Sequence, residues 1–239
     1  MTLPILYSLQ NCPYAMRARL AILLAQQSVL LRAIVMQDKP PEMLAVSPKG
    51  TVPVLVLDTI SENAVIDESL AIMLWALNLN DPENLRYAHD GDVDGAALAE
   101  MLEIIHENDN VFKPQLEKYK RAKRFHGDDE EQCRLLCEPF VQKLEYRLTQ
   151  HAFLMGDTPS LLDYALLPFM RQFSRVNRQL YLHGPYTHLQ RWLNHHLQSR
   201  LYAKAMLKYP LWLDTHEACI FGEQYNKNMD GLHPASIPF

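Results

Sequence analysis

The spacing of apolar residues changes partway along this chain, and that change limits the fold more than any other feature. Up to about residue 80, short apolar runs that suit strands alternate with segments that suit helices. From about Ala96 onward no strand-like run follows, and apolar residues recur at the three- and four-residue intervals of a buried helix face. The sequence therefore predicts an α/β unit followed by an all-α unit.

The first unit is expected to run strand, helix, strand, an irregular stretch, two strands and a final helix. A helix should begin just after Cys12, because Pro13 is favoured in a first helical turn. Ser69 can cap the last helix, which should reach about Leu79. The polar segment 58–63 is a hairpin signal between two apolar runs. The four strands are expected at residues 4–8, 29–35, 54–57 and 64–66.

The second unit should form around one buried helix, since Leu161–Phe173 is apolar nearly all round. Residues 133–148 carry an apolar stripe over several turns of another helix. The mixed charges of residues 118–131 predict a solvated connection between helices. Residues 78–94 are the expected linker. The predicted domains are residues 1–79, residues 93–220 and a polar C-terminal tail, residues 221–239.

Composition removes several classes of protein. The formal net charge of the 239 residues is −5, which argues against a protein that mainly binds nucleic acid non-specifically. No apolar run approaches the roughly 18 residues that a membrane span needs, and residues 1–7 do not resemble a secretory signal. The four cysteines have neither the density of a disulfide scaffold nor zinc-ribbon spacing. We expect a cytoplasmic enzyme or binding protein without a metal site.

Cys12 is the first candidate for chemistry. A thiol at a helix N-terminus lies near free N–H groups and the positive end of the helix dipole, which stabilise the nucleophilic thiolate. The alternative is that Cys12 is a small, inert residue at a strand–helix junction. Arg17 and Arg19 follow inside the helix. They can add positive potential, but a place on the surface is the better interpretation.

Two dipeptides are the next candidates. Val52 precedes a proline and so favours extended geometry, which leaves its main-chain N–H and C=O free to pair with a peptide ligand. On its own, Pro53 is best interpreted as an ordinary strand-opening proline. Glu68 and Ser69 stand at the mouth of a helix, where carboxylates bind well. The alternative for Ser69 is a simple helix cap.

The order and spacing of these motifs resemble those of the cytosolic glutathione transferases, and most closely their cysteine-type omega class. That resemblance implies a thioredoxin-like α/β N-terminal domain, an all-α C-terminal domain and an active cleft between them. It covers residues 3–79 well, residues 93–215 more loosely, and not the tail. The matching segments are Cys12-Pro13-Tyr14-Ala15, Asp38-Lys39-Pro40, Val52-Pro53-Val54-Leu55, Glu68-Ser69, and Ser160–Tyr164 with its capping box, followed by Pro168.

The resemblance also implies a role for each matching residue. Cys12 corresponds to the active-site cysteine. Lys39 would pair with the glycyl carboxylate of glutathione, and the Val52 main chain with its cysteinyl part. Glu68 and Ser69 would hold the γ-glutamyl amine and carboxylate. The glutathione-binding residues implied in this way are Lys39, Val52, Pro53 (as a cis proline), Glu68 and Ser69.

The preferred function is a glutathione-dependent thiol transferase or reductase. Ala15 stands where dithiol glutaredoxins carry a second cysteine, so any redox cycle must pass through a Cys12–glutathione mixed disulfide. The alternatives are conjugation of glutathione to hydrophobic electrophiles, and a non-catalytic binding or regulatory protein with the same fold. The partners implied are glutathione, an electrophile or disulfide substrate, and a second copy of the chain as a homodimer, with no membrane or nucleic acid.

Other residues receive weaker assignments. The resemblance implies that His106, Asn110 and Phe112 border the electrophile side of the cleft, and His106 is also a candidate by likeness to beta-class enzymes. Tyr7 suggests a tyrosine-type mechanism, but a place in a strand is the better interpretation. Core packing explains Cys133 and Cys137, which lie four residues apart on an apolar stripe, better than a metal pair does. The histidines at 195 and 196 are expected to be structural or on the surface.

Overall fold

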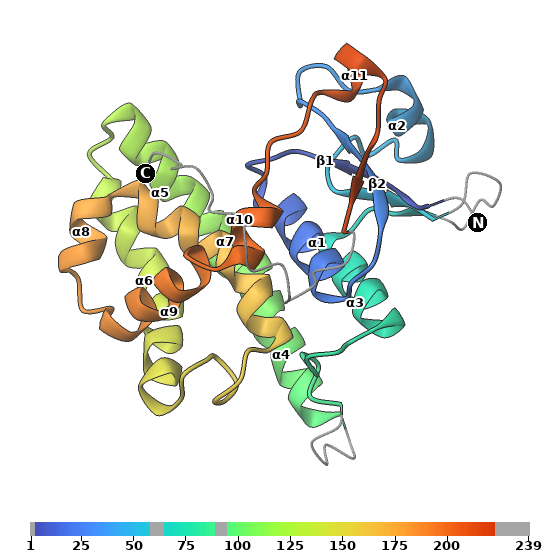
Figure 1. The fold of residues 1–239 in the computed structure, drawn as a ribbon. Coiled ribbons are helices and arrows are strands. Elements are labelled where there is room, and N and C mark those ends of the chain that lie inside the picture. Colours follow the sequence, from blue (N-terminus) through green and yellow to red (C-terminus); the bar gives the residue numbers. More distant parts are fainter. Residues whose placement is uncertain (1–2, 58–64, 89–94, 223–239) are drawn as a thin grey trace.

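The chain folds into an α/β half and a helical half that lie side by side (Figure 1). The computed structural model describes residues 3–57, 65–88 and 95–222. The predicted hairpin turn at residues 58–63 lies outside the described residues, as does most of the predicted C-terminal tail. No helix in the described segments is long and apolar enough to cross a membrane.

The N-terminal half contains the predicted sheet. Its strands are β1 (Ile5–Ser8), β2 (Val29–Ala33), β3 (Val54–Val56), β4 (Val65–Ile66) and β5 (Cys219–Phe221). They lie in the order β4-β3-β1-β2-β5. Strands β1 and β2 are parallel, and every other pair is antiparallel. The four strands expected before residue 80 are confirmed, and their sheet is mixed as predicted.

Helices cover both faces of this sheet, and strand alternation sorts the side chains between them. Leu6 of β1 faces a core shared with α1 (Pro13–Leu24) and α3 (Ser69–Leu79). The next residue, Tyr7, faces the opposite side, where it packs with Met43 of α2 (Pro41–Val46). Pro13 begins α1 as expected. One detail is wrong: Glu68 is the N-cap of α3, and Ser69 is its first helical residue.

The last strand contradicts the expectation that no strand follows residue 96. β5 pairs antiparallel with the edge strand β2, so that Phe221 lies opposite Val29. Phe221 is 1% exposed and joins the main core. The chain therefore leaves the helical half and returns to the sheet in which it began, as Figure 1 shows beside β2. Three residues followed by a polar tail give too short a signal to be recognised without the partner strand.

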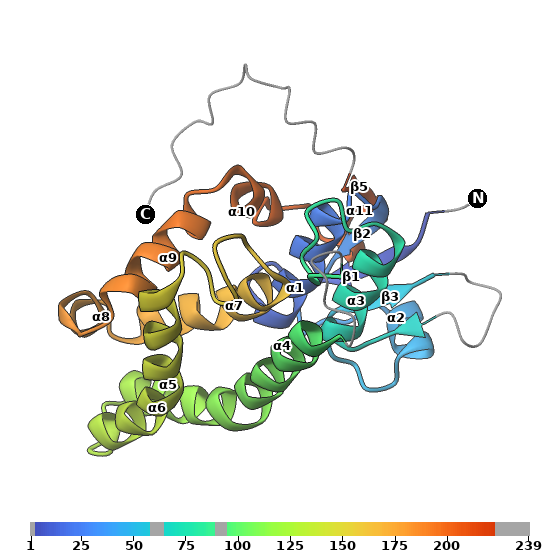
Figure 2. The ribbon, with the colours of Figure 1, turned by 90° about the horizontal axis from the view of Figure 1, so that it is seen from below.

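The helical half is built from α4 (Ala96–Glu107), η1 (Asn108–Phe112), α5 (Lys113–Phe125), α6 (Glu130–Gln150), α7 (Leu161–Val176), α8 (Arg178–His183), α9 (Thr187–Leu197) and α10 (Arg200–Ala205). The short α11 (Trp212–Thr215) lies against the α/β half, where the indole N–H of Trp212 donates to Glu42 of α2. Helix α7 is buried along most of its length, as predicted. Seen from below, α4 and α5 run along one side of this half, and α10 lies on the other (Figure 2).

The predicted solvated connection at residues 118–131 is largely wrong. Helix α5 continues to Phe125, and only residues 126–129 separate it from α6. The physical reason is an apolar stripe within the charged sequence, because Leu116, Tyr119 and Ala122 are buried at helical spacing. The charged residues of this segment occupy the remaining faces of the helix.

The capping box at the start of α7 is confirmed. The carboxylate of Asp163 is fully buried and accepts hydrogen bonds from the backbone N–H and the hydroxyl of Ser160, at 2.8 and 2.6 Å. It also accepts from the backbone N–H of Leu154 and the indole N–H of Trp192. One carboxylate thus joins the start of α7 to α9 and to the preceding loop.

Arg17 joins the two halves, which corrects the expectation that it lies on the surface. Its side chain is fully buried, and it donates two hydrogen bonds to the carboxylate of Asp109, at 2.7 and 2.8 Å. Its Nε–H donates to the carbonyl of Ala165 in α7 at 2.7 Å. The rings of Tyr14 and Phe169 meet edge to face nearby, with centroids 5.2 Å apart. These contacts hold α1 antiparallel to α7.

Candidate functional site

Two motifs that lie 40 residues apart in the sequence meet at the N-terminus of α1. Cys12 is the N-cap of this helix and is half-buried. Its Sγ lies 3.7 Å from the carbonyl oxygen of Val52, within thiol hydrogen-bond distance. The Val52–Pro53 peptide bond is cis, as the resemblance implies. The thiol therefore lies beside a main-chain segment that precedes β3.

Arg19 lies behind Cys12 and is also buried, so the expectation of a surface position is wrong. Its exposed fraction is 2%, and one guanidinium N–H donates to the carbonyl of Gln10 in the loop before Cys12. Burial lowers the Arg19 pKa to about 10, and the nearby Cys12 opposes that shift. At neutral pH this residue places a positive charge behind the thiol.

The mouth of α3 brings several polar groups together. Ser69 is 4% exposed, whereas Glu68 points outward and forms an ion pair with Lys49. That contact raises the pKa of Lys49, because the carboxylate stabilises the charged ammonium. The hydroxyl of Ser47 donates to Asp67 at 3.1 Å. Sequence reasoning missed Lys49, although it stands in the same short loop as Val52.

Lys39 lies against this loop as well. It is half-buried, and a Cβ added to Gly50 would lie 3.2 Å from its Nζ. The φ of Gly50 is +62°, a left-handed value that glycine adopts without strain. The loop thus brings the Lys39 ammonium close to the backbone that leads to Val52.

The three residues suggested for the electrophile side fall into two environments. Phe112 is 1% exposed and packs between the rings of Phe140 and Phe173, with centroids 4.9 and 6.0 Å away. It is therefore a core residue, and we do not retain it as a lining residue. His106 and Asn110 are exposed, and their side chains are hydrogen-bonded to each other at 3.0 Å.

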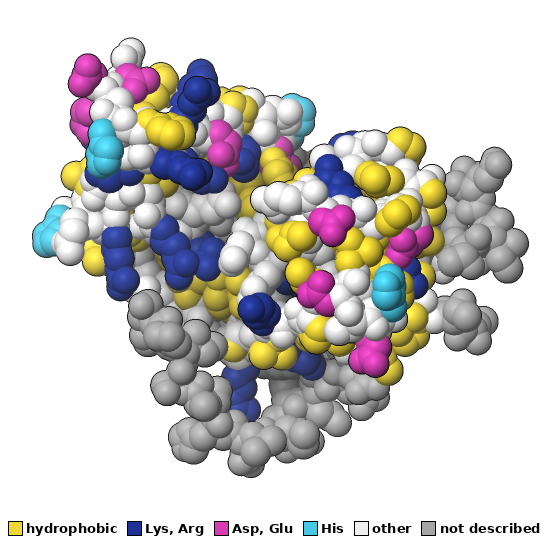
Figure 3. All heavy atoms as spheres, turned by 90° about the horizontal axis from the view of Figure 1, so that it is seen from above, with side chains coloured by type: hydrophobic (Ala, Val, Ile, Leu, Met, Phe, Trp, Pro, Cys, Tyr) yellow, Lys and Arg dark blue, Asp and Glu magenta, His cyan; other side chains and the backbone are white. Residues whose placement is uncertain are grey.

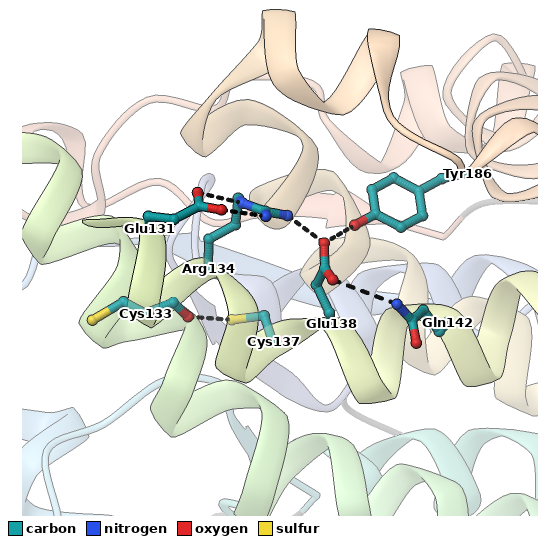
Figure 4. A network of polar contacts seen from close by, with 7 residues as sticks. All are labelled: Glu131, Cys133, Arg134, Cys137, Glu138, Gln142 and Tyr186. Carbon is teal, nitrogen blue, oxygen red and sulfur yellow. Dashed lines mark hydrogen bonds and ion pairs between the residues drawn. The ribbon is translucent and has the colours of Figure 1, made fainter. Parts of the chain in front are cut away.

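The weaker assignments also have clear places. Tyr7 lies within β1, as expected, and its hydroxyl accepts from Arg32 at 2.7 Å. Cys133 and Cys137 are buried on α6, where the Cys137 thiol donates to the Cys133 carbonyl at 3.5 Å (Figure 4). Burial raises the Cys137 pKa to about 12, which keeps it a thiol. No three His, Cys, Asp or Glu side chains gather as a metal site would require in the described segments.

A different face of α6 carries an ion-pair network (Figure 4). Arg134 pairs with Glu131 at 2.7 Å and with Glu138 one turn further on. Glu138 also accepts from the hydroxyl of Tyr186 at 2.7 Å. These contacts join α6 to the start of α9. Because each of these side chains is paired within the protein, we interpret the network as structural.

His196 is almost fully buried among aromatic rings, whereas His195 is exposed. The centroid of the His196 ring lies 5.0 Å from that of Trp192 and 5.3 Å from that of Tyr164. Burial lowers its pKa to about 3, with a smaller contribution from His195. The expectation that these two histidines are structural or on the surface is confirmed.

Comparison with known proteins agrees with this geometry. Residues 6–84 match the family model for the glutathione S-transferase N-terminal domain, and residues 131–195 match the model for its C-terminal domain. Together these matches cover more than half of the chain. The chain belongs to the glutathione transferase family. No curated protein sequence matches it.

Solved glutathione transferase structures share the whole fold. Poplar glutathione transferase F1 is 18% identical with a TM-score of 0.69, covering 86% of this chain and 97% of its own. A Pseudomonas fluorescens family member with two glutathione bound is 17% identical with a TM-score of 0.69, covering 85% and 92%. Glutathione S-transferase I bound with lactoylglutathione is 22% identical with a TM-score of 0.68, covering 86% and 99%. The thioredoxin-like domain and helical domain predicted from the sequence are thus confirmed.

Proposed function

We propose that this glutathione transferase is a thiol transferase of the omega type, with Cys12 as the catalytic residue. The observation that carries the proposal is the 3.7 Å contact between Cys12 Sγ and the Val52 carbonyl. A glutathione whose cysteinyl main chain pairs with Val52 places its sulfur beside Cys12. Structures with similar folds have been solved with glutathione or lactoylglutathione bound.

The residues around Val52 suit the charges of glutathione. The tripeptide carries two carboxylates and one ammonium. Lys39, half-buried beside the loop, supplies a cation for the glycyl carboxylate. The N-terminus of α3 and the hydroxyl of Ser69 suit the γ-glutamyl carboxylate, and Glu68 suits the ammonium. Lys49 has to share Glu68 with that ammonium.

The proposed reaction exchanges one disulfide for another. The Cys12 thiolate attacks the glutathionyl sulfur of a mixed disulfide, and the substrate leaves as a thiolate that takes up a proton. A second glutathione thiolate then attacks the glutathionyl sulfur held on Cys12. That step releases oxidised glutathione and restores the Cys12 thiolate. In each step Cys12 lies at the N-terminus of α1, with the positive charge of Arg19 behind it.

The test is a paired assay on Cys12→Ser and the unmodified protein. We expect the variant to lose reduction of a glutathione mixed disulfide, because a serine hydroxyl forms no mixed disulfide. Conjugation of glutathione to an aryl halide should survive, because serine can still donate a hydrogen bond to the glutathione thiolate. Cys133→Ser, in the helical core, is the matched control and should keep reduction. Normal reduction by Cys12→Ser would overturn the proposal in favour of conjugation or binding.

A homodimer and a cytoplasmic location complete the proposal, and both rest on the family resemblance. Light scattering behind size-exclusion chromatography measures the first directly. A mass near 55 kDa, about twice the 27.6 kDa chain, is expected. A mass near that of one chain would contradict it.

A further inference from the structure

A basic pocket lies between α5 and the C-terminal part of α7. We use the term basic pocket for the cavity of about 280 Å³ lined by Lys120, Lys123, Arg124, Arg171, Gln172 and Arg175, with Val176 beside them. Five of these side chains are cationic, and none of the described lining residues is acidic. In the view from above, Lys and Arg side chains gather on the helical half of this face (Figure 3). The family resemblance suggests a hydrophobic electrophile, but a lining with five cationic side chains does not suit one.

The positive charge of the pocket is only partly balanced by the protein. Lys120 lies 2.8 Å from Glu117, and Lys123 lies 3.0 Å from Glu130. The three arginines of the pocket form no ion pair within the described part of the chain. An anion entering the pocket therefore meets guanidinium groups that no carboxylate of the described residues neutralises.

An unmet hydrogen bond marks the same place. The Nε–H of Arg171, a donor, is buried without a hydrogen-bond partner. Burial lowers the pKa of Arg171; Tyr202 opposes this shift, and the charge of Arg175 adds to it. A carboxylate or sulfonate would accept a hydrogen bond from the Arg171 guanidinium and offset the repulsion between the two arginines.

The pocket lies at the level of the thiol. Arg17 of α1 contacts Ala165 of α7, and Tyr14 contacts Phe169. The two helices therefore run antiparallel. The next turn of α7 beyond Phe169 therefore lies level with Cys12, and that turn carries Arg171 and Gln172 of the pocket, while Arg175 lies one turn further on. A molecule that reacts at Cys12 and extends along α7 toward its C-terminal end would approach the basic pocket.

We propose that the basic pocket binds an anionic group on the second substrate, so that acidic glutathione mixed disulfides react faster than neutral ones of the same shape. This inference rests on the proposed thiol-transferase function. The chemical class is a small thiol compound that carries a carboxylate or sulfonate a few bonds from its sulfur. Arginine suits this role because its planar guanidinium binds a carboxylate through two parallel hydrogen bonds.

The test uses two mixed disulfides of glutathione, one with 3-mercaptopropionate and one with its neutral isostere 3-mercaptopropionamide. We expect kcat/KM to be higher for the acid by roughly tenfold or more. This factor corresponds to the free energy of one hydrogen bond to a charged group. The advantage should shrink in high salt, because screening weakens attraction at a partly exposed site. In Arg171→Gln/Arg175→Gln the ratio of acid to amide should fall toward one. Arg191→Gln, exposed on α9, is the matched control and should keep the ratio.

Arg124→Gln is the second variant, because this exposed residue can be changed without disturbing the core. It should also reduce the ratio. Equal kcat/KM for the acid and the amide in the unmodified protein would overturn the proposal, as would a ratio that Arg171→Gln/Arg175→Gln and Arg124→Gln both preserve. Either result leaves the thiol-transferase function intact if reduction still requires Cys12. Reduction that survives Cys12→Ser would instead defeat the proposed function itself.

Discussion

The hydroxyl of Ser69 lies at the mouth of α3 on a side chain that is only 4% exposed. A ligand carboxylate that binds there exchanges water for a hydrogen bond in a sheltered place. We therefore expect Ser69→Ala to weaken glutathione binding by about 1.5–3 kcal/mol, the usual value of a hydrogen bond to a charged group. Calorimetric titration with glutathione measures this loss. Thr149→Ala, exposed at the end of α6, should bind normally, and unchanged affinity of Ser69→Ala would remove this residue from the site.

The candidate site could be predicted only as a set of separate residues. Each motif has a local cause, such as Pro13 starting a helix after Cys12. Their meeting depends on the sheet, which brings the loop before β3 beside the loop after β1. The buried arginines could not be predicted, because Arg17 is covered by Asp109, which lies 92 residues further along the chain. No periodicity in α1 distinguishes a buried arginine from an exposed one.

Helix α1 is joined to η1 by the Arg17–Asp109 pair, in which the arginine is fully buried and the aspartate 25% exposed. Removing the carboxylate leaves the guanidinium without its partner in the interior. We expect Asp109→Ala to lower the free energy of unfolding by about 3–5 kcal/mol. Urea unfolding followed by circular dichroism measures this change.

Glu107→Ala is the control for that prediction, because it removes a more exposed ion pair two residues away. Glu107 pairs with Lys143 at 2.6 Å, and both side chains are more than a third exposed. Such surface pairs contribute about 0–1 kcal/mol. If the two substitutions destabilise the protein equally, the Arg17–Asp109 pair does not hold the halves together.

Helix α9 packs on α7 through His196, whose folded pKa is about 3 because it is buried. The unfolded chain binds a proton at this residue below about pH 6.5, whereas the folded chain binds none until about pH 3. Stability should therefore fall as the pH drops through that window, by about 1.4 kcal/mol per pH unit from this residue. In His196→Phe the slope measured by urea unfolding between pH 5 and 6.5 should decrease by that amount. His183→Gln, exposed on α8, should keep the original slope.

The elements themselves could largely be predicted from periodicity, since burial on one face imposes it. The central helix α7 and the first four strands follow from apolar spacing alone. Among the elements that were missed, α2 lies in the stretch expected to be irregular, and α5 and β5 were missed for different reasons. The stripe of α5 is hidden among charged residues, and β5 is too short to be distinguished without its partner β2. Short strands depend on pairing more than on their own sequence.

The molecule as a whole is closed by β5, because the first and last strands of the described residues lie in one sheet with the helical half between them. The strand lies against β2, and Phe221 fills the core beneath it. The segment before it is also attached to the α/β half, where the Arg32 guanidinium lies 3.8 Å above the Trp212 ring. The two halves are thus held by the α1–α7 contacts and, independently, by the returning chain.

Gly222 tests this closure, because it directly follows β5 and lies against the backbone of Gln27. Its φ is +96°, and a Cβ there would overlap the backbone carbonyl oxygen of Gln27. Gly95, which precedes α4, has a φ of +66° and nothing within 4 Å of an added Cβ. We expect Gly95→Ala to cost only the roughly 1–2 kcal/mol of a left-handed backbone. Gly222→Ala should cost clearly more, because β5 must leave β2 to relieve the overlap. Urea unfolding of both variants decides the matter, and equal losses would mean that β5 contributes little to holding the molecule together.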